Sequence, residues 1–404
     1  MKLVRRMYCR VFQQAFHLAL PVLPYRRPVL LEGVKGVGAL LKEKGIGTVL
    51  LVTDRGVRGL GLTRPLEEQL QRDGIRMEVY DGTLANPTTG NVEEARQLYL
   101  DRGCGALIGF GGGSAMDCAK AVGARIACPR KPLSRMRGIL KVRRRIPLLI
   151  AVPTTAGTGS ETTLAAVVVD SETRYKYPIN DFALIPPYAL LDPDVTLSLP
   201  PMLTACTGMD ALTHAVEAYI GHSTIRSTRE DARKAVSLIF RYLPRAVAQG
   251  DDREARAGML EAAYCAGNAF TRSYVGYVHA VAHSLGGKYN LPHGQTNAIL
   301  LPGVLEQYGS AVYRRLHELA IAAGIAGQED GDEAAARRFI GAIREMNRQF
   351  GIPETISGIR QEDIPELARL ADREANPLYP VPVEMDAEEL EKLYRMVMEV
   401  EAHG

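Results

Sequence analysis

The sequence lacks the features that would mark a secreted, membrane-spanning or nucleic-acid-binding protein. Its six cysteines are scattered and form no CxxC pair, which excludes a disulfide framework or a zinc knuckle and favours a reducing cytoplasm. No run approaches the ~20 apolar residues that a membrane-spanning helix requires. The 49 basic and 46 acidic residues leave a net charge of +3, too small to predict nucleic-acid binding. Tryptophan is absent altogether, and that absence excludes nothing.

What is present is an alternation of strand and helix signals over the first half of the chain. A length of 404 residues predicts two domains rather than one core. Apolar runs at 48–53, 76–80, 106–110 and 148–153 alternate with helical stretches near 64–73, 91–102 and 114–127. This pattern predicts a parallel sheet with helices on both faces. Residues 164–179 predict a β-hairpin that turns at 170–173.

The second half of the chain has a different pattern. The segment LSLPP at 198–202 is a plausible hinge, and after it helical periodicity dominates. We therefore expect three parts: an amphipathic extension at 1–28, an α/β domain at 29–200 and an all-helical domain at 201–404.

Two basic segments have more than one interpretation. Residues 1–23 resemble a signal peptide, but Arg10, Gln13, Gln14 and His17 interrupt the apolar stretch, so a basic amphipathic helix fits better. Such a helix packs on its own protein or a partner subunit, or it makes weak contact with a membrane surface. Residues 129–146 carry eight basic residues and no acidic one, which fits a solvated loop or a site for an acidic partner.

Glycine-rich and hydroxyl-rich segments follow two of the expected strands. The run GGGS at 111–114 lies between a strand and a helix beginning near Ala115, where glycine lets a phosphate approach unpaired N–H groups. It departs from the GxGxxG spacing of the common dinucleotide fold. PTTAGTGSE at 153–161 follows another strand, at the sheet edge where open α/β folds bind ligands, although it could be only a capped polar loop.

Asp54 stands at the end of the first expected strand. A carboxylate there can accept both hydroxyls of an adenosine ribose and repels a 2′-phosphate, which favours NAD over NADP. The alternative is a turn residue that caps the next helix.

Histidines are few, yet four of them lie with Asp210 in two short segments. Of eight in the chain, His279, His283 and His293 fall within fifteen positions. Asp210 and His214 are spaced i, i+4, so both project from one face of a helix, and His279 and His283 repeat that spacing. This nitrogen and oxygen set suits a divalent metal such as Fe(II), Zn(II), Mn(II) or Ni(II) with an open position for substrate. Spacing alone does not say which histidine is left out.

In combination, these motifs resemble one known family. From about residue 29 to the C-terminus the chain is similar to the iron-containing (group III) alcohol dehydrogenases. The likeness rests on NPT at 86–88, GGGSAMDCAK at 111–120, PTTAGTGSE at 153–161, DALTHAVEAYI at 210–220 and HAVAHSLGGKYNLPHG at 279–294. It implies a Rossmann-like NAD-binding α/β domain followed by a helical metal-binding domain, a dehydroquinate synthase-like architecture.

The resemblance also assigns residues. The metal, Fe(II) or alternatively Zn(II), would be held by Asp210, His214, His279 and His293. His283 would lie beside it near the nicotinamide and substrate, and we expect it to relay a proton, while Phe270 would line the substrate pocket. Positions matching cofactor contacts are Asp54, Asn86, Gly112, Gly113, Ser114, Asp117, Thr154, Thr155, Thr158 and Lys176.

The implied reaction is reversible hydride transfer between NAD(H) and a small alcohol or aldehyde, catalysed by a cytoplasmic homodimer. The metal would act as a Lewis acid on the substrate oxygen. The alternatives are a glycerol- or glycerol-phosphate-type dehydrogenase, a dehydroquinate-synthase-like lyase, and a metal-binding helical interaction module attached through its basic N-terminus. A non-catalytic module would have no use for the GGGS and PTTAGTGSE loops.

Overall fold

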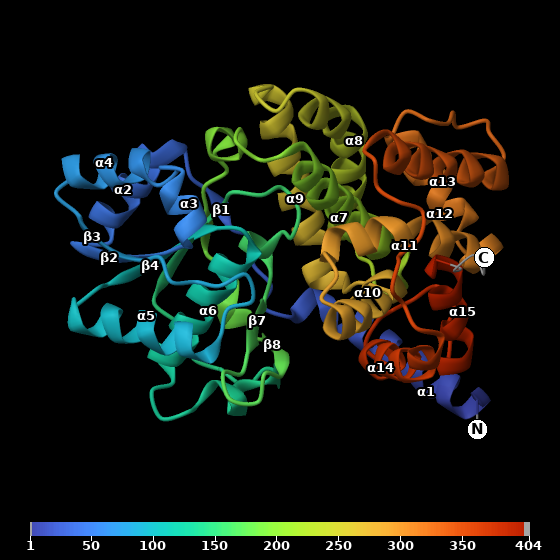
Figure 1. Cartoon of the computed structure of the whole chain (residues 1–404), viewed down its shortest axis with the longest axis horizontal. Helices are drawn as coiled ribbons and strands as arrows, with labels where there is room; N and C mark the ends of the chain where they lie inside the picture. Colours follow the sequence, from blue (N-terminus) through green and yellow to red (C-terminus); the bar gives the residue numbers. More distant parts are fainter. Residues whose placement is uncertain (1, 400–404) are drawn as a thin grey trace. The chain divides into compact units, whose positions relative to one another are not determined.

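The structure, a computed structural model, describes residues 2–399, with side chains from residue 4 onward. Over these residues the chain forms two compact units (Figure 1). One comprises Pro24–Ser198, and the other joins Met1–Leu23 to Leu199–Gly404. The N-terminal segment, which we expected to be an extension of its own, therefore packs with the helical half of the chain.

The unit Pro24–Ser198 is built on a six-stranded parallel sheet with strand order β1-β9-β6-β4-β2-β3. Its central strands are Val-, Leu- and Ile-rich and buried on both faces, as parallel strands normally are. The strands are β1 (Val29–Leu30), β2 (Thr48–Val52), β3 (Arg76–Tyr80), β4 (Ala106–Gly111), β6 (Leu148–Pro153) and β9 (Tyr188–Ala189).

Helices cover both faces of this sheet, as Figure 1 shows. On one face Val49 and Leu51 pack against apolar residues of α2 and α4, and on the other Leu50 and Leu107 pack against α5 and α6. This alternation follows from the two-residue period of a strand. The helices of this unit are α2 (Gly33–Glu43), α3 (Arg55–Gly59), α4 (Arg64–Arg72), α5 (Thr89–Asp101), α6 (Gly113–Ala127), and the 3-10 turns at Leu133–Met136, Ser160–Thr162, Phe182–Leu184 and Pro193–Thr196.

A second, three-stranded sheet contains the predicted hairpin. Strand β7 (Ala165–Val169) pairs antiparallel with β8 (Lys176–Asn180), which confirms the turn expected at 170–173. Strand β5 (Gly138–Ile139) pairs with the other edge of β8. The basic segment 129–146 is therefore only partly a loop, because Leu133 and Met136 are buried and two residues join a sheet.

The other unit is helical throughout its described residues, apart from an isolated bridge between Ile356 and Met398. Its longest buried stretch is α7, which Pro201 starts at a position where proline suits the first helical turn. The helices are α1 (Lys2–Ala19), α7 (Pro201–Ile220), α8 (Arg226–Ala248), α9 (Arg253–Ser273), α10 (Tyr277–Tyr289), α11 (His293–Tyr308), α12 (Tyr313–Ala322), α13 (Asp332–Gln349), α14 (Ile364–Ala375), α15 (Ala387–Val397), and the 3-10 turns at Leu20–Val22, Gly309–Ala311 and Gln361–Asp363.

These two units confirm the expected fold class of a Rossmann-like α/β part and a helical part. The strands predicted at 76–80 and 148–153 have the same bounds in the structure, and those at 48–53 and 106–110 differ by one residue. Within the described residues, no helix is long and apolar enough to cross a membrane.

Candidate active site

Three donor atoms from three helices converge in the helical unit. Asp210 Oδ1 on α7 lies 3.8 Å from His279 Nε2 on α10 and 3.5 Å from His293 Nε2 at the start of α11. All three atoms lie within 4.8 Å of one another. Donors bound tetrahedrally at metal–ligand distances near 2.1 Å stand about 3.4 Å apart, so the spacing fits a single metal ion.

The chain turns sharply to bring α11 back against α7. Asn290 ends α10 in the left-handed region, with φ +55°, a conformation that asparagine tolerates at helix ends. Pro292 then precedes His293 as the N-cap of α11. Gly294 follows, and a Cβ at this position would clash with the backbone carbonyl of Cys206 on α7. Glycine is therefore required for α11 to approach Asp210 closely.

His214, the fourth predicted ligand, lies beside the converging atoms rather than among them. Its ring stacks on Phe270 at 4.1 Å and on His279 at 4.5 Å, and its Nδ1 is 4.0 Å from Asp210 Oδ2. Phe270, which we expected in the substrate pocket, thus contacts the ring of a predicted ligand. The structure brings three of the four predicted donors together and places the fourth in van der Waals contact with them.

Asn297 is a site residue that the sequence analysis missed. Its Nδ2 lies 2.7 Å from Asp210 Oδ1, 3.2 Å from His279 Nε2 and 3.1 Å from His293 Nε2. Three lone-pair donors thus point at one electropositive amide group, an arrangement that a cation also satisfies. The signal was available in the sequence, because Asn297 lies one helical turn after His293.

Glu217 is a second missed residue, and it supports His279 from behind. Its Oε2 lies 2.6 Å from His279 Nδ1, and its Oε1 accepts a 2.8 Å hydrogen bond from the backbone N–H of Val278. Burial raises the pKa of Glu217 to about 7. A carboxylate on Nδ1 fixes the imidazole tautomer that leaves Nε2 free to bind a metal. Glu217 lies two turns after Asp210 on the same face of α7, so helical spacing could have found it.

The imidazole of His279 is suited to metal binding because it is held neutral. Burial, together with the neighbouring rings of His214, His293 and His283, lowers the pKa of His279 well below its ordinary value. A histidine must be deprotonated on the ligating nitrogen before it can bind a metal.

His283 lies at the edge of this cluster, in a hydrogen-bonded chain. Its ring stacks on that of His293 at 5.1 Å, and its Nδ1 lies 2.6 Å from Glu374 Oε1 on α14. The hydroxyl of Tyr379 donates to the same oxygen over 2.7 Å. Burial alone would raise the pKa of Glu374, but His283, with smaller effects of Tyr379 and His293, outweighs it and the pKa is lowered.

In the α/β unit, the two predicted phosphate-binding segments lie next to each other. β4 and β6 pair up to Gly111 and Pro153, and Thr154 N donates to Gly111 O over 3.0 Å. Gly111 has φ +148°, and a Cβ there would lie 2.7 Å from the Cβ of Ala115. Helix α6 begins at Gly113 without any side-chain cap on its first turn. Its N-terminal N–H groups therefore face no capping side chain, as anion binding requires.

The polar residues predicted to contact cofactor divide into two groups. Asp54 caps α3 by accepting a 2.9 Å hydrogen bond from Val57 N, as the alternative interpretation expected. Both carboxylate oxygens of Asp117 accept hydrogen bonds from the protein, from Ser160 Oγ at 2.7 Å and Val167 N at 3.0 Å. Other residues predicted to contact the cofactor contact one another or nearby backbone. Lys176 Nζ donates to Asn86 Oδ1 over 2.8 Å, Ser114 Oγ donates to Ala85 O, and Thr158 Cγ2 would lie 3.1 Å from a Cβ on Gly113.

Lys120, which the sequence analysis overlooked, anchors the segment after β6. It is fully buried, and its Nζ donates to Ser160 Oγ, Thr163 O, Thr163 Oγ1 and Ala165 O over 2.8–3.0 Å. Burial lowers its pKa to about 8 and raises that of the nearby Glu161 to about 7. The segment is thus held by a buried cation rather than by the sheet alone.

We expect Glu161→Gln to remove a pH dependence of stability. The folded-state pKa of Glu161 is about 7 and its ordinary value is 4.5, so the folded protein binds the extra proton between those pH values. The free energy of unfolding should therefore fall by about 3 kcal/mol as pH rises through this window. Urea denaturation of both proteins from pH 4.5 to 7.5 measures the difference, and parallel stability curves would contradict the assignment.

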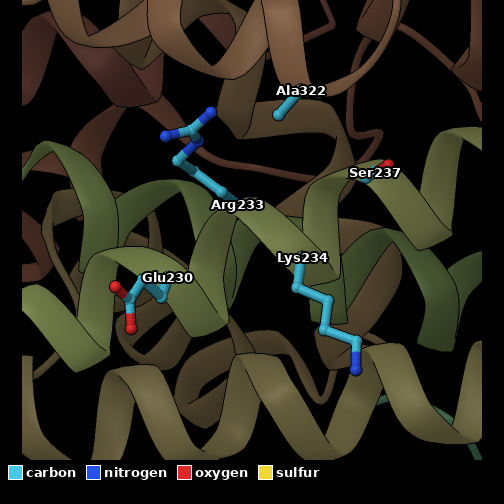
Figure 2. A pocket seen from close by; sticks show the side chains of 5 residues that line it. All are labelled: Glu230, Arg233, Lys234, Ser237 and Ala322. Atoms are coloured by element: carbon cyan, nitrogen blue, oxygen red, sulfur yellow. The ribbon is translucent and has the colours of Figure 1, made fainter.

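A surface hollow on the helical unit lies apart from these residues. It has a volume of about 350 Å³ and is lined by Glu230, Arg233, Lys234, Ser237 and Ala322 of α8 and α12 (Figure 2). None of the predicted site residues lines it, and we assign it no role.

Comparison with known proteins identifies the family. Residues 32–193 match the model of iron-containing alcohol dehydrogenases, and residues 204–398 match that of the C-terminal part of the same family. The NAD-dependent methanol dehydrogenase of Bacillus methanolicus is 37% identical over 340 residues, covering 84% of this chain and 89% of that protein.

Solved structures agree over almost the whole chain. A 1,3-propanediol oxidoreductase superposes with a TM-score of 0.87 at 34% identity, covering 92% of this chain and 98% of the other. Sulfoacetaldehyde reductase from Bifidobacterium kashiwanohense, in complex with NAD⁺, gives a TM-score of 0.82 at 28% identity, covering 92% and 98%. The chain therefore belongs to the iron-containing alcohol dehydrogenases, a family of metal-dependent oxidoreductases of alcohols and aldehydes.

Proposed function

We propose that this protein is an NAD-linked, metal-dependent dehydrogenase that interconverts a small alcohol and its aldehyde or ketone. The observation that carries the proposal is the convergence of Asp210, His279 and His293 on one point. Relatives named for methanol, 1,3-propanediol and lactaldehyde agree with a small oxygenated substrate. The free, buried cysteines suit a reducing cytoplasm.

The metal site is assigned to Asp210, His214, His279 and His293. Three of these donors already have the required spacing. His214 is assigned as the fourth because its ring stacks on His279 and its Nδ1 lies 4.0 Å from Asp210 Oδ2. The mixed nitrogen and oxygen donors suit Fe(II), with Zn(II) as the alternative. These residues would hold a divalent metal, which would supply Lewis-acid polarisation of a substrate oxygen, and NAD⁺ would be the hydride acceptor. Asn297 keeps Asp210 in place through its 2.7 Å hydrogen bond.

The cofactor is assigned to the edge of the sheet where β4 and β6 end. Gly112, Gly113 and the uncapped start of α6 would take the pyrophosphate, with Ser114, Thr154, Thr155 and Thr158 donating hydroxyl or backbone hydrogen bonds. Asn86 and Lys176, which are already hydrogen bonded to each other, would form the opposite rim. Asp117 supports the loop through Ser160 and Val167 instead of offering free oxygens.

We expect Asp54→Ser to relax the preference for NAD over NADP. Only one oxygen of Asp54 caps α3, so the other is available to a ribose hydroxyl, and its charge opposes a 2′-phosphate. Serine also caps helices, so this variant keeps the fold of α3 while removing the charge. The KM for NAD⁺ should rise about tenfold, and that for NADP⁺ should fall. Unchanged KM values for both cofactors would remove Asp54 from the ribose site.

We expect His283→Ala to lower kcat by about 100-fold, because His283 would no longer pass the alcohol proton toward solvent. The ring is 43% exposed and is held by Glu374, so it joins the cluster to water. His283→Gln is the matched control, since glutamine keeps a hydrogen bond to Glu374 but does not carry a proton. Both variants should lose the same limb of the pH–rate profile and retain the metal. A wild-type profile in either would exclude the relay.

The decisive test of the function is NADH production across a panel of alcohols, with aldehyde reduction as the reverse assay. Enzyme reconstituted separately with Fe(II) and Zn(II) should turn over short alcohols or diols. Absence of NADH turnover with every alcohol, in protein that binds both metal and NADH, would overturn the proposal.

A further inference from the structure

Helix α1 lies on the helical unit with a mixed face inward, on which Cys9 and Gln13 are buried, and its arginines lie along the border of that face. Arg5 pairs with Asp372 of α14 at 2.5 Å, Arg6 with Glu389 of α15 at 2.7 Å, and Arg10 with Glu384 at 2.9 Å. Every arginine of the helix is therefore already matched by an acidic side chain of the same unit. Figure 1 shows α1 running beside α14.

Hydrogen bonds fix this orientation. Gln13 is buried and donates to Tyr379 O over 2.9 Å, and Arg10 donates to Val381 O over 2.8 Å and Pro382 O over 3.0 Å. Cys9 and Leu20 are buried on the same side of the segment. Polar groups satisfied by buried backbone carbonyls hold the helix in one rotation about its axis.

The apolar face of α1 consequently points into solvent. In α1, Val4, Met7, Tyr8, Val11 and Leu18 are each 59–71% exposed, and Phe12 and Ala15 are exposed between them. Steps of three and four residues place these side chains on one face, which we name the α1 stripe. A monomer rarely leaves a contiguous apolar patch of more than a few hundred Å² in water. The α1 stripe thus marks a surface that another molecule covers.

The charges favour a protein over a lipid surface as that molecule. Helices that lie on membranes present free lysine or arginine to anionic headgroups. In α1 the arginines are paired with Asp372, Glu384 and Glu389, so those charges are already neutralised. A stripe without charged side chains has the composition of the core of a protein–protein interface, which is depleted of charge.

The stripe is complementary to itself about Val11. In an antiparallel pair of helices crossing at Val11, Val4 of one copy faces Leu18 of the other, and Met7 faces the small Ala15. Apolar residues thus meet apolar residues along the pair, and Val4, Val11 and Leu18 repeat every seven residues, as in a coiled-coil seam. We propose that the α1 stripe is a self-association surface, at which two copies of this chain pair through antiparallel α1 helices.

The size of the surface predicts a reversible contact. Helix α1 is about 27 Å long, at 1.5 Å per residue. One helix pair buries less than the roughly 800 Å² per partner of a standard interface. Association through α1 should therefore depend on protein concentration in the micromolar range, whatever other contacts the chain makes.

Cross-linking tests the geometry directly. All six native cysteines are buried, so Val11→Cys introduces an exposed thiol at the centre of the stripe. With diamide as oxidant, this variant should form a disulfide-linked dimer on a non-reducing gel. Leu60→Cys is the control, because Leu60 is 65% exposed and lies in the other unit. Equal rates of linking in the two variants would overturn the proposal.

Sedimentation velocity tests the association itself. Leu18 is 71% exposed and Leu60 is 65% exposed, so aspartate at either position leaves the cores untouched. Leu18→Asp should weaken the concentration-dependent step by about 100-fold or more, while Leu60→Asp leaves it as in the wild type. An unchanged step in Leu18→Asp, or no step in the wild type, would overturn the proposal. So would flotation of the wild type with phosphatidylserine vesicles that Leu18→Asp abolishes, since the stripe would then bind lipid.

Discussion

Asp210→Ala should lose both bound metal and turnover while continuing to bind NADH. Asp210 is the only anionic group among the converging donors, and its Oδ1 faces both His279 and His293. Its removal leaves only imidazoles as donors and also removes the shortest hydrogen bond of the Asn297 amide. We expect metal affinity to fall about 1,000-fold or more, equivalent to roughly 4 kcal/mol.

Elemental analysis after dialysis measures the metal, and fluorescence titration measures NADH. Asp210→Asn is the informative companion, since it keeps the shape and a hydrogen-bonding oxygen but removes the charge. If Asp210→Asn retains metal, the anionic charge is not what the site requires. If Asp210→Ala loses NADH binding together with the metal, the two binding sites are not independent, and the assignment of the cofactor to the α/β unit fails.

How much of the fold could be predicted depended on whether an element repeats a pattern. Strands β2, β4 and β6 carry five or six residues each, enough to show a buried apolar run. β1, β5 and β9 have two residues each and carry no period, so only their pairing partners define them. Strand β5, within 129–146, was not predicted for this reason, and the basic composition of that segment indicated a loop instead.

The site residues likewise divide into those with a pattern in the sequence and those without one. Helical or turn spacing alone identified the candidate metal ligands, among them Asp210, His214, His279 and His293. Contacts between helices that are far apart in the chain show no spacing pattern in the sequence. Glu374 meets His283 only because α14 lies beside α10, and no local pattern links residues 91 positions apart.

Helix α1 shows a different limit. Its amphipathic period was predicted, but a period says only that the two faces differ, not which of them faces the protein. The orientation is set by ion pairs of Arg5, Arg6 and Arg10 with acidic side chains more than 360 positions along the chain, and by the burial of Cys9 and Gln13. The usual assumption that the more apolar face packs inward gives the wrong orientation here, because the side with Val4, Val11 and Leu18 is exposed.

Glu217→Gln should weaken metal binding about 10–100-fold without unfolding the protein, as expected for a residue that orients a ligand. Its carboxylate accepts from two donors at once, His279 Nδ1–H and Val278 N–H. An amide offers one acceptor and one donor group. If its oxygen faces Val278, its NH₂ faces His279, so Nδ1 becomes the acceptor and the proton moves to Nε2. A protonated Nε2 has no lone pair for a metal.

Competition with a chelating dye gives the metal affinity independently of activity. Glu306→Gln is the control, because Glu306 forms an exposed ion pair with Arg344 on the surface. Burial already raises the pKa of Glu217 to about 7 in the metal-free protein, so loss of its charge alone costs little folding stability. The deficit should therefore appear in metal affinity and not in the melting temperature of the metal-free protein. Equal metal affinity in Glu217→Gln and Glu306→Gln would mean that packing by His214 and Asn297 is enough to hold His279 in its ligating tautomer.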